Sequence, residues 1–144
     1  MVSCGWSNPT PWNTPRECGE DQLARRLDGL VAGLANPTQA IFNLHVPPSD
    51  TVLDVCPELD DDLRVVTVMG SPVQQHAGSA AVRDVIERAQ PRLSLHGHIH
   101  ESRGVTRIGR TTAVNAGSEY SEGVLLGAVI DLDGDPAGVV LTAG

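Results

Sequence analysis

The sequence predicts one α/β domain over residues 1–144, with a mixed or antiparallel group of strands at its C-terminal end. A length of 144 residues is typical of a single domain, and a hydrophobic content of 40% can supply a core. Two segments have the three- and four-residue apolar spacing of helices. Short apolar runs bounded by turn residues separate and follow these segments, which is typical of buried strands.

The first part of the chain predicts a loop, a helix and a strand, in that order. Residues 3–16 combine prolines with asparagines and predict an ordered loop rather than a helix or a strand. A helix is expected from about Gly19 to Asn36, because leucines recur along one face between them. Residues 39–46 form a short apolar run, which predicts a buried strand that two prolines end.

The rest of the chain predicts one further helix and several strands. Residues 49–62 and 70–78 are expected to be loops on either side of a possible strand at 65–69. Ser79 predicts the N-cap of a helix that Pro91 ends. Later apolar runs predict strands at 93–95, 105–108, 112–115, 124–132 and 139–142.

Charge and cysteine content exclude several partners and sites. The chain has 18 acidic and 10 basic residues and a net charge of −8, so neither nucleic acid nor an anionic membrane is expected as a partner. No apolar run approaches the roughly 20 residues of a membrane span, and the N-terminus does not read as a signal peptide. Three scattered cysteines predict reduced thiols. Together these features predict a cytoplasmic protein.

Histidines are concentrated in one short segment. His96, His98 and His100 are three of the five histidines in the chain, and they follow directly on a predicted strand. In an extended segment, residues two apart project to the same side, so His98 and His100 are expected to approach a common point. Neutral imidazole is the commonest protein ligand for metal ions. A metal site is therefore favoured over the alternative, a histidine-rich surface turn.

Three further positions have both a structural and a functional interpretation. His45 ends a predicted strand, and ligands of open α/β sheets gather at the carboxyl ends of strands, so His45 can share a site with His98 and His100. For His45 alone, a structural role is equally compatible with the sequence. The Asn115–Ser118 segment favours an ordinary turn. Arg16 could neutralise a phosphate, although a solvated side chain in a packed loop is favoured.

The order of these motifs resembles that of the calcineurin-like metallophosphoesterases. Gly97–His100 is similar to the G-H-x-H element that ends the metal-binding set of that family. Asn43–Pro48 resembles its isolated histidine after a core strand, and Asn115–Ser118 resembles its asparagine–x–glycine–serine turn. Residues 5–17 and 78–102 look like one bacterial and archaeal branch of the family. These elements occur in family order over most of the chain.

The resemblance implies a layered sandwich of mixed β-sheet flanked by helices, and hydrolysis of a phosphoester by metal-activated water. It implies that His45 and His98 bind one divalent ion and that His100 binds a second, with manganese, zinc or iron as the metal. A small phosphoester is the expected substrate, because a polyanion would be repelled by the acidic chain. The sequence does not distinguish phosphomonoesters from phosphodiesters.

The resemblance covers only the C-terminal half of a phosphoesterase domain. The aspartate–x–histidine, glycine–aspartate and glycine–asparagine–histidine motifs that open the family pattern have no counterpart before His45. Without their carboxylate, three imidazoles are expected to hold at most one weakly bound ion. Four carboxylates within the chain are candidates to complete the site, although none has the family's spacing, and these are Asp50, Asp54, Glu101 and Glu119.

An incomplete domain is expected to expose apolar strand faces and to self-associate into a homo-oligomer. Three functions remain open at this point. The first is a metal-dependent phosphoesterase to which a partner chain contributes carboxylates. The second is a non-catalytic metal-binding or oligomerising fragment. The third is an interaction protein in which the histidines have no ligand.

Overall fold

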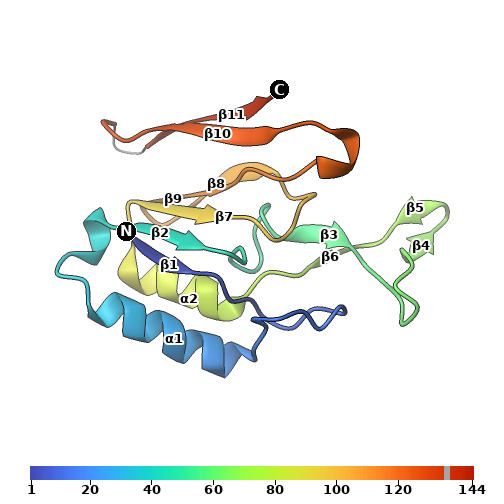
Figure 1. The fold of residues 1–144 in the computed structure, drawn as a ribbon, viewed down its shortest axis with the longest axis horizontal. Helices are drawn as coiled ribbons and strands as arrows, with labels where there is room; N and C mark the ends of the chain where they lie inside the picture. Colours follow the sequence, from blue (N-terminus) through green and yellow to red (C-terminus); the bar gives the residue numbers. More distant parts are fainter. Residues whose placement is uncertain (135–136) are drawn as a thin grey trace.

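The computed structural model describes residues 1–134 and 137–144, and it confirms the α/β class with a mixed central sheet. The five strands of that sheet are, in spatial order, β1 (Val2–Cys4), β2 (Ile41–Leu44), β7 (Leu93–His96), β9 (Thr111–Asn115) and β8 (Gly104–Ile108). The first four strands are parallel to one another, and β8 pairs antiparallel with β9. The carboxyl ends of the parallel strands therefore point the same way (Figure 1).

Two helices cover one face of this sheet, and the core lies between the two layers (Figure 1). Helix α1 (Glu20–Ala32) begins where the sequence predicts and ends four residues earlier than expected. Helix α2 (Ala80–Ala89) packs against α1. The core contains these fully buried side chains: Leu23, Leu27, Phe42, Leu44, Val46, Val82, Val85 and Ile86. Neither helix of the described residues has the length and hydropathy that crossing a membrane requires.

The N-terminus of α2 is capped from two sides. The Ser79 hydroxyl accepts a hydrogen bond from the Val82 N–H at 3.2 Å and donates to the Glu20 carboxylate at 2.7 Å. Glu20 also accepts from the Ala81 N–H at 2.8 Å, so a carboxylate of α1 stabilises the positive end of α2. The N-cap that the sequence predicts at Ser79 is confirmed.

Replacing Ser79 with alanine is expected to lower the free energy of unfolding by about 1–2 kcal/mol, because the helix loses its cap and Glu20 loses a donor. Urea unfolding followed by circular dichroism measures this loss. Ser71→Ala, a change at an exposed residue, is the control, and it should stay within about 0.5 kcal/mol of the wild type. Equal stability of the two variants would contradict the capping role.

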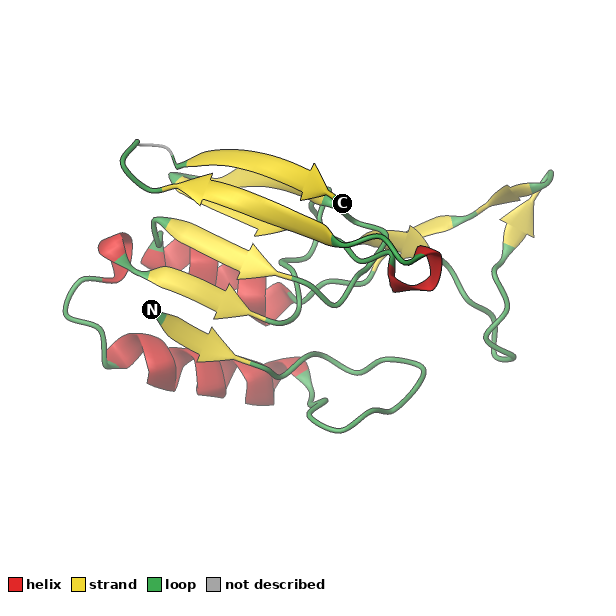
Figure 2. Ribbon diagram, turned by 45° about the horizontal axis from the view of Figure 1, so that its top comes forward, coloured by secondary structure: helices red, strands yellow, loops and turns green. Residues whose placement is uncertain are grey.

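A protruding arm, residues 55–76, leaves the domain beyond the carboxyl ends of the parallel strands (Figure 2). It consists of two short antiparallel pairs, β3 (Val55–Pro57) with β6 (Gln74–His76), and β4 (Thr67–Val68) with β5 (Ser71–Pro72). The prediction that 49–62 and 70–78 are loops is wrong at β3, β5 and β6. The predicted loop at 3–16 likewise overlaps β1. Strands of two or three residues carry no alternation that a sequence could display.

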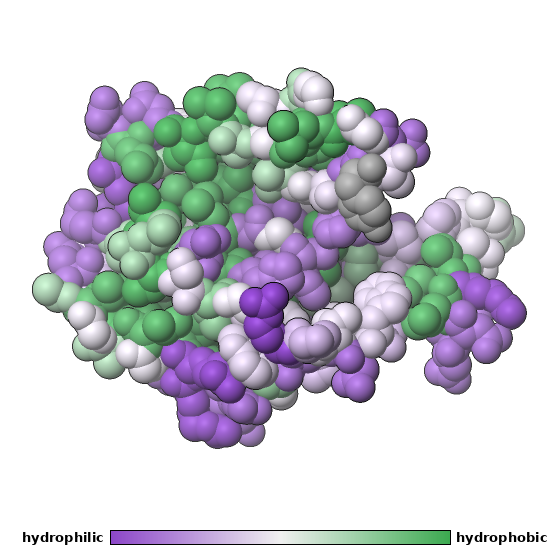
Figure 3. Space-filling view, in the orientation of Figure 1, coloured by the Kyte–Doolittle hydropathy of each residue, from purple (hydrophilic) through white to green (hydrophobic). Residues whose placement is uncertain are grey.

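The C-terminal hairpin, β10 (Leu126–Asp131) with β11 (Gly138–Ala143), lies on the side of the sheet away from the helices (Figures 1 and 2). Val129 and Val140 face each other across its strands and are 63% and 64% exposed. Figure 3 shows that hydrophobic residues gather over this hairpin. The guanidinium of Arg103 donates to the Thr142 carbonyl at 3.0 Å and connects the hairpin to the segment before β8.

Two short 3-10 helices complete the described fold, η1 (Pro37–Gln39) and η2 (Tyr120–Glu122). The first occupies the start of the strand predicted at 39–46, so β2 begins only at Ile41. The strands expected at 93–95, 105–108, 112–115, 124–132 and 139–142 are all present, with ends shifted by one or two residues.

Candidate metal-binding site

The candidate site lies at the carboxyl ends of the parallel strands. His45 directly follows β2, and His98 lies two residues beyond the neighbouring strand β7. The His45 N–H donates to the Cys4 carbonyl at 2.9 Å, and the His45 carbonyl accepts from the Gly97 N–H at 3.0 Å. Backbone hydrogen bonds from both neighbouring strands therefore fix the position of His45 at the sheet edge.

The imidazoles of His45 and His98 are in direct contact. The distance from His45 Nε2 to His98 Nδ1 is 3.1 Å, with ring centroids 4.8 Å apart and ring planes at 67°. Two nitrogen ligands at about 2.0–2.1 Å from one zinc ion stand about 2.9–3.4 Å apart, for right and tetrahedral angles respectively. The observed separation lies within this range, and it is also an ordinary hydrogen-bond distance between the two ring nitrogens. The expectation that His45 and His98 converge is confirmed.

His98 is presented by a strained turn. Its φ is +66°, in the left-handed region, and the Ile99 N–H donates to the Gly97 carbonyl at 2.7 Å. This hydrogen bond closes a three-residue γ-turn around a residue that is not glycine, which costs conformational energy. The expectation that residues 96–100 are extended is therefore wrong, because the chain turns at His98 instead of alternating. Strain of this kind is concentrated at functional positions.

Asn115, the last residue of β9, holds this turn in place. Its side chain is fully buried, and its amide Nδ2 donates to the Ile99 carbonyl at 2.8 Å and to the Gly97 carbonyl at 3.5 Å. Its Oδ1 accepts from the Gly117 N–H at 2.9 Å. The ordinary turn favoured for residues 115–118 does form. However, Asn115 also contacts the residues on both sides of His98, and no local signal in the sequence reveals this.

His96 has a structural role. Its Nδ1 lies 3.1 Å from the Leu44 carbonyl and 3.0 Å from the Val46 carbonyl, the two residues that flank His45. Its Nε2 lies 2.9 Å from the Ser94 hydroxyl. Burial lowers the pKa of His96 to about 4, so the ring is neutral at pH 7 and donates from Nδ1 to those carbonyls. His96 thus ties the end of β2 to β7.

The electrostatic surroundings keep the two contacting imidazoles neutral. Partial burial lowers the pKa of His45, and electrostatic interactions with Arg16 and with His100 lower it further. Partial burial also lowers the pKa of His98, with added contributions from His45 and His100 and an opposing one from Glu17. A neutral imidazole offers a lone pair, whereas a protonated one does not, so both rings are suited to bind a cation at pH 7.

The third expected ligand is not gathered with the other two. His100 is exposed, and its charge acts on the pKa of both His45 and His98. Over residues 1–134 and 137–144, however, no group of three or more His, Cys, Asp and Glu side chains is arranged to hold a metal ion. The structure therefore shows a pair of candidate ligands, and the ligand role of His100 stays a prediction.

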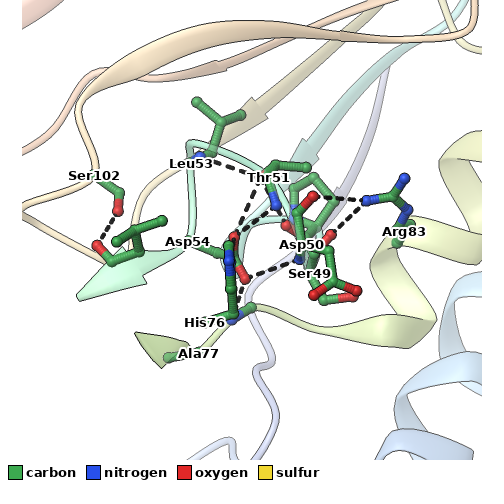
Figure 4. Close-up of polar contacts among 12 residues, drawn as sticks. Ser49, Asp50, Thr51, Leu53, Asp54, His76, Ala77, Arg83 and Ser102 are labelled. Carbon is green, nitrogen blue, oxygen red and sulfur yellow. Dashed lines mark hydrogen bonds and ion pairs between the residues drawn. The ribbon is translucent and has the colours of Figure 1, made fainter. Parts of the chain in front are cut away.

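Asp54 is committed to a structural network. Its side chain is fully buried and accepts hydrogen bonds from the N–H groups of Thr51 at 2.8 Å, Gly78 at 3.1 Å and Asp50 at 3.2 Å. Its Oδ1 lies 2.9 Å from Nδ1 of His76, as Figure 4 shows. With its oxygens occupied in this way, Asp54 organises the loop at the base of the arm and is not free to bind a cation.

The contact between Asp54 and His76 predicts a pH effect on stability. This hydrogen bond and the carboxylate charge raise the pKa of His76 above its usual 6.5. Protonated His76 therefore stabilises the fold below pH 6.5, and the contribution is lost as pH rises through the raised pKa. The stability difference between wild type and His76→Gln, measured by urea unfolding, should shrink between pH 6 and pH 8.5. A difference that grows with pH would contradict this assignment.

The N-terminal loop, residues 8–17, brings a cation beside the histidine pair. The Glu17 carboxylate accepts four hydrogen bonds from the backbone and hydroxyl groups of Thr10 and Thr14, which lower its pKa to about 2. Arg16, the residue before Glu17, has a left-handed φ of +71° and is exposed. Its guanidinium makes no hydrogen bond or ion pair with any residue that the structure describes. Arg16 is therefore available to an anion next to His45.

Comparisons with known proteins identify relatives without a known activity. No protein-family model matches the sequence. The chain is 38% identical over 118 residues to an uncharacterized protein of Methanocaldococcus jannaschii, a match that covers 80% of this chain and 46% of that protein. One crystal structure superposes with a TM-score of 0.59 at 24% identity, over 88% of this chain and 40% of the other, and so shares its fold. The chain thus spans less than half the length of both.

Proposed function

We propose that this chain carries the metal-binding part of a phosphoesterase site, in which His45 and His98 bind one divalent cation. The observation that carries the proposal is the 3.1 Å separation of His45 Nε2 and His98 Nδ1 at the carboxyl ends of adjacent parallel strands. The motif order that resembles calcineurin-like metallophosphoesterases supports the same reading. Manganese, zinc and iron are the candidate ions, because imidazole suits them.

The chain's own residues have separate roles in this proposal. A cation at the pair would polarise the phosphoryl oxygens and make an attacking water more acidic. The γ-turn and Asn115 orient His98, and the backbone bonds to Cys4 and Gly97 orient His45. Arg16 binds a phosphoryl oxygen through its available guanidinium. Since two imidazoles do not complete a coordination shell, the remaining ligands are water, substrate oxygens or carboxylates of a partner chain.

Calorimetric titration with Mn²⁺ and Zn²⁺, combined with an assay on bis(p-nitrophenyl) phosphate, tests this function. Wild type is expected to bind one ion per chain and to hydrolyse the ester slowly, and both properties should be lost in His45→Ala and in His98→Ala. His76→Ala, which changes an exposed histidine away from the pair, is the matched control. Hydrolysis that survives in both pair variants would remove the proposed site.

The alternative is a metal-binding or oligomerising module without turnover. The family's carboxylate motifs are absent from the sequence, which favours this alternative. The hydrogen bonds that Asp54 accepts from Thr51 and Gly78 also favour it, because they occupy its oxygens. Binding of one ion without any hydrolysis at saturating metal would select this alternative. If calorimetry detects no binding of any metal tested, the remaining interpretation is an interaction protein whose histidines have no ligand.

We also propose that two chains associate through the C-terminal hairpin. Its outer face carries Leu125, Val129 and Val140, exposed by 79%, 63% and 64%, with few charges between them. An apolar face of this kind is typical of an interface. Val129→Asp is expected to shift sedimentation towards the monomer. Val68→Asp, at a position 61% exposed on the arm, should leave the association unchanged. A wild type that sediments as a monomer would refute this proposal.

A further inference from the structure

A cavity of about 280 Å³ adjoins the histidine pair, between the N-terminal loop and the arm. His98 and Ile99 form its floor. Pro11 and Trp12 of the loop also line it, together with Leu59, Leu63 and Val65 of the arm. Figures 1 and 2 show the tip of the N-terminal loop directed towards the arm. The cavity therefore shares one residue, His98, with the proposed cation site.

The lining of the cavity selects an uncharged apolar group. Among the residues that the structure describes, no arginine lines it, and Glu101 is the one carboxylate in its lining. Glu101 would repel a phosphoryl group there, whereas Arg16, which lies outside the lining, and a cation at the histidine pair would attract it. The indole of Trp12 is 60% exposed, so a wide flat surface faces solvent without a partner in the described chain. Aromatic surfaces of this kind favour contact with a ring.

Hydrogen bonds fix the N-terminal loop to the base of the arm beside the cavity. Asn8 of the N-terminal loop donates to the carbonyls of Ala77 and Gly78 at the base of the arm, both at 3.3 Å. Glu17 braces the loop through Thr10 and Thr14. Ligand pockets are usually preformed and hold about 300–1,000 Å³. A cavity near the lower limit accommodates one small ring system rather than a long chain or a polymer.

We propose that this cavity binds the apolar, ring-sized alcohol portion of the phosphoester, which makes small aryl phosphoesters the preferred substrates. This inference rests on the proposed function, since it assigns the phosphoryl group to Arg16 and to a cation at His45 and His98. Trp12, Leu63 and Val65 then determine specificity, and the acidic wall at Glu101 excludes a second phosphate or other anion from the same space.

Binding of phenylphosphonate and of methylphosphonate to the Mn²⁺-loaded protein, measured by calorimetry, tests the inference. Phenylphosphonate is expected to bind about tenfold more tightly, because burial of its ring adds apolar contact. Trp12→Ala and Val65→Asp should each remove this preference and leave the affinity for methylphosphonate unchanged. The matched controls are Trp6→Phe, which changes the other tryptophan, and Val68→Asp, which places a carboxylate on the arm outside the cavity. Both controls should keep the preference.

A second measurement separates the cavity from the phosphoryl site. Neutral 1-naphthol, added without metal, should quench the fluorescence of Trp6→Phe, where Trp12 is the remaining indole, and not that of Trp12→Phe. Equal affinity for the two phosphonates, together with no quenching, would overturn the inference and leave the proposed function standing. Quenching by naphthol without binding of either phosphonate would overturn the proposed function, and with it the assignment of the occupant to a phosphoester.

Discussion

Replacing His98 with either glycine or alanine is expected to weaken Zn²⁺ binding by at least about 100-fold, because residues that merely orient a ligand already contribute about 10–100-fold. The two variants should nevertheless differ in stability. His98 adopts a φ of +66°, which glycine accommodates and alanine does not. The glycine variant is therefore expected to be more stable than the alanine variant by about 1–2 kcal/mol.

Met69 provides the control for this pair of variants. It also adopts a left-handed φ, +52°, and it lies fully exposed at the tip of the arm, away from the histidines. Met69→Gly should exceed Met69→Ala in stability by a similar amount, and both should bind Zn²⁺ as the wild type does. Calorimetry measures the affinity, and urea unfolding measures the stability. Metal affinity that survives in His98→Gly would show that strain at this position serves something other than a cation.

Replacing Asn115 with alanine is expected to reduce the free energy of unfolding by about 2–4 kcal/mol, because the carbonyls of Leu53, Gly97 and Ile99 each lose a hydrogen bond from its buried amide. Metal affinity should fall by about 10–100-fold in the milder Asn115→Ser variant, since the turn that presents His98 is no longer clamped. This second variant keeps the test informative if the alanine variant fails to fold.

Asn43→Ala, a change at an exposed asparagine of β2, is the control and should affect neither property. Chemical denaturation and metal titration of the same samples compare the variants. A loss of stability in Asn115→Ser without any loss of metal affinity would mean that Asn115 supports the sheet alone and does not position His98.

The helices and the main strands could be predicted because their signals are local. Ser79 caps α2 through an N–H only three residues away, and the apolar spacing of α1 reports the face that it buries. Ligands of open α/β sheets gather at the carboxyl ends of the strands, and this predicted that His45 and His98 lie close together. The structure agrees, because β2 and β7 are parallel neighbours. The arm could not be predicted, since strands of two or three residues owe their existence to partners rather than to propensity.

The finer features of the site depend on contacts between distant segments. Histidine carries no signal for a left-handed φ, so the γ-turn at His98 is invisible in the sequence. An asparagine two residues before a glycine predicts the turn at 115–117 whether or not its amide reaches back to residues 97 and 99. Trp12 of the N-terminal loop and Leu63 of the arm line one cavity, although they are about 50 residues apart in the sequence.

The clamp between Asn115 and the turn at His98 determines when the site is assembled during synthesis of the chain. His45, Gly97 and His98 leave the ribosome before β9, whose last residue, Asn115, donates the hydrogen bonds to the turn. A nascent or prematurely terminated chain that ends before Asn115 therefore has both imidazoles without the geometry that unites them. In the proposed function, binding of a metal ion at the pair would therefore have to wait until the parallel sheet is in place.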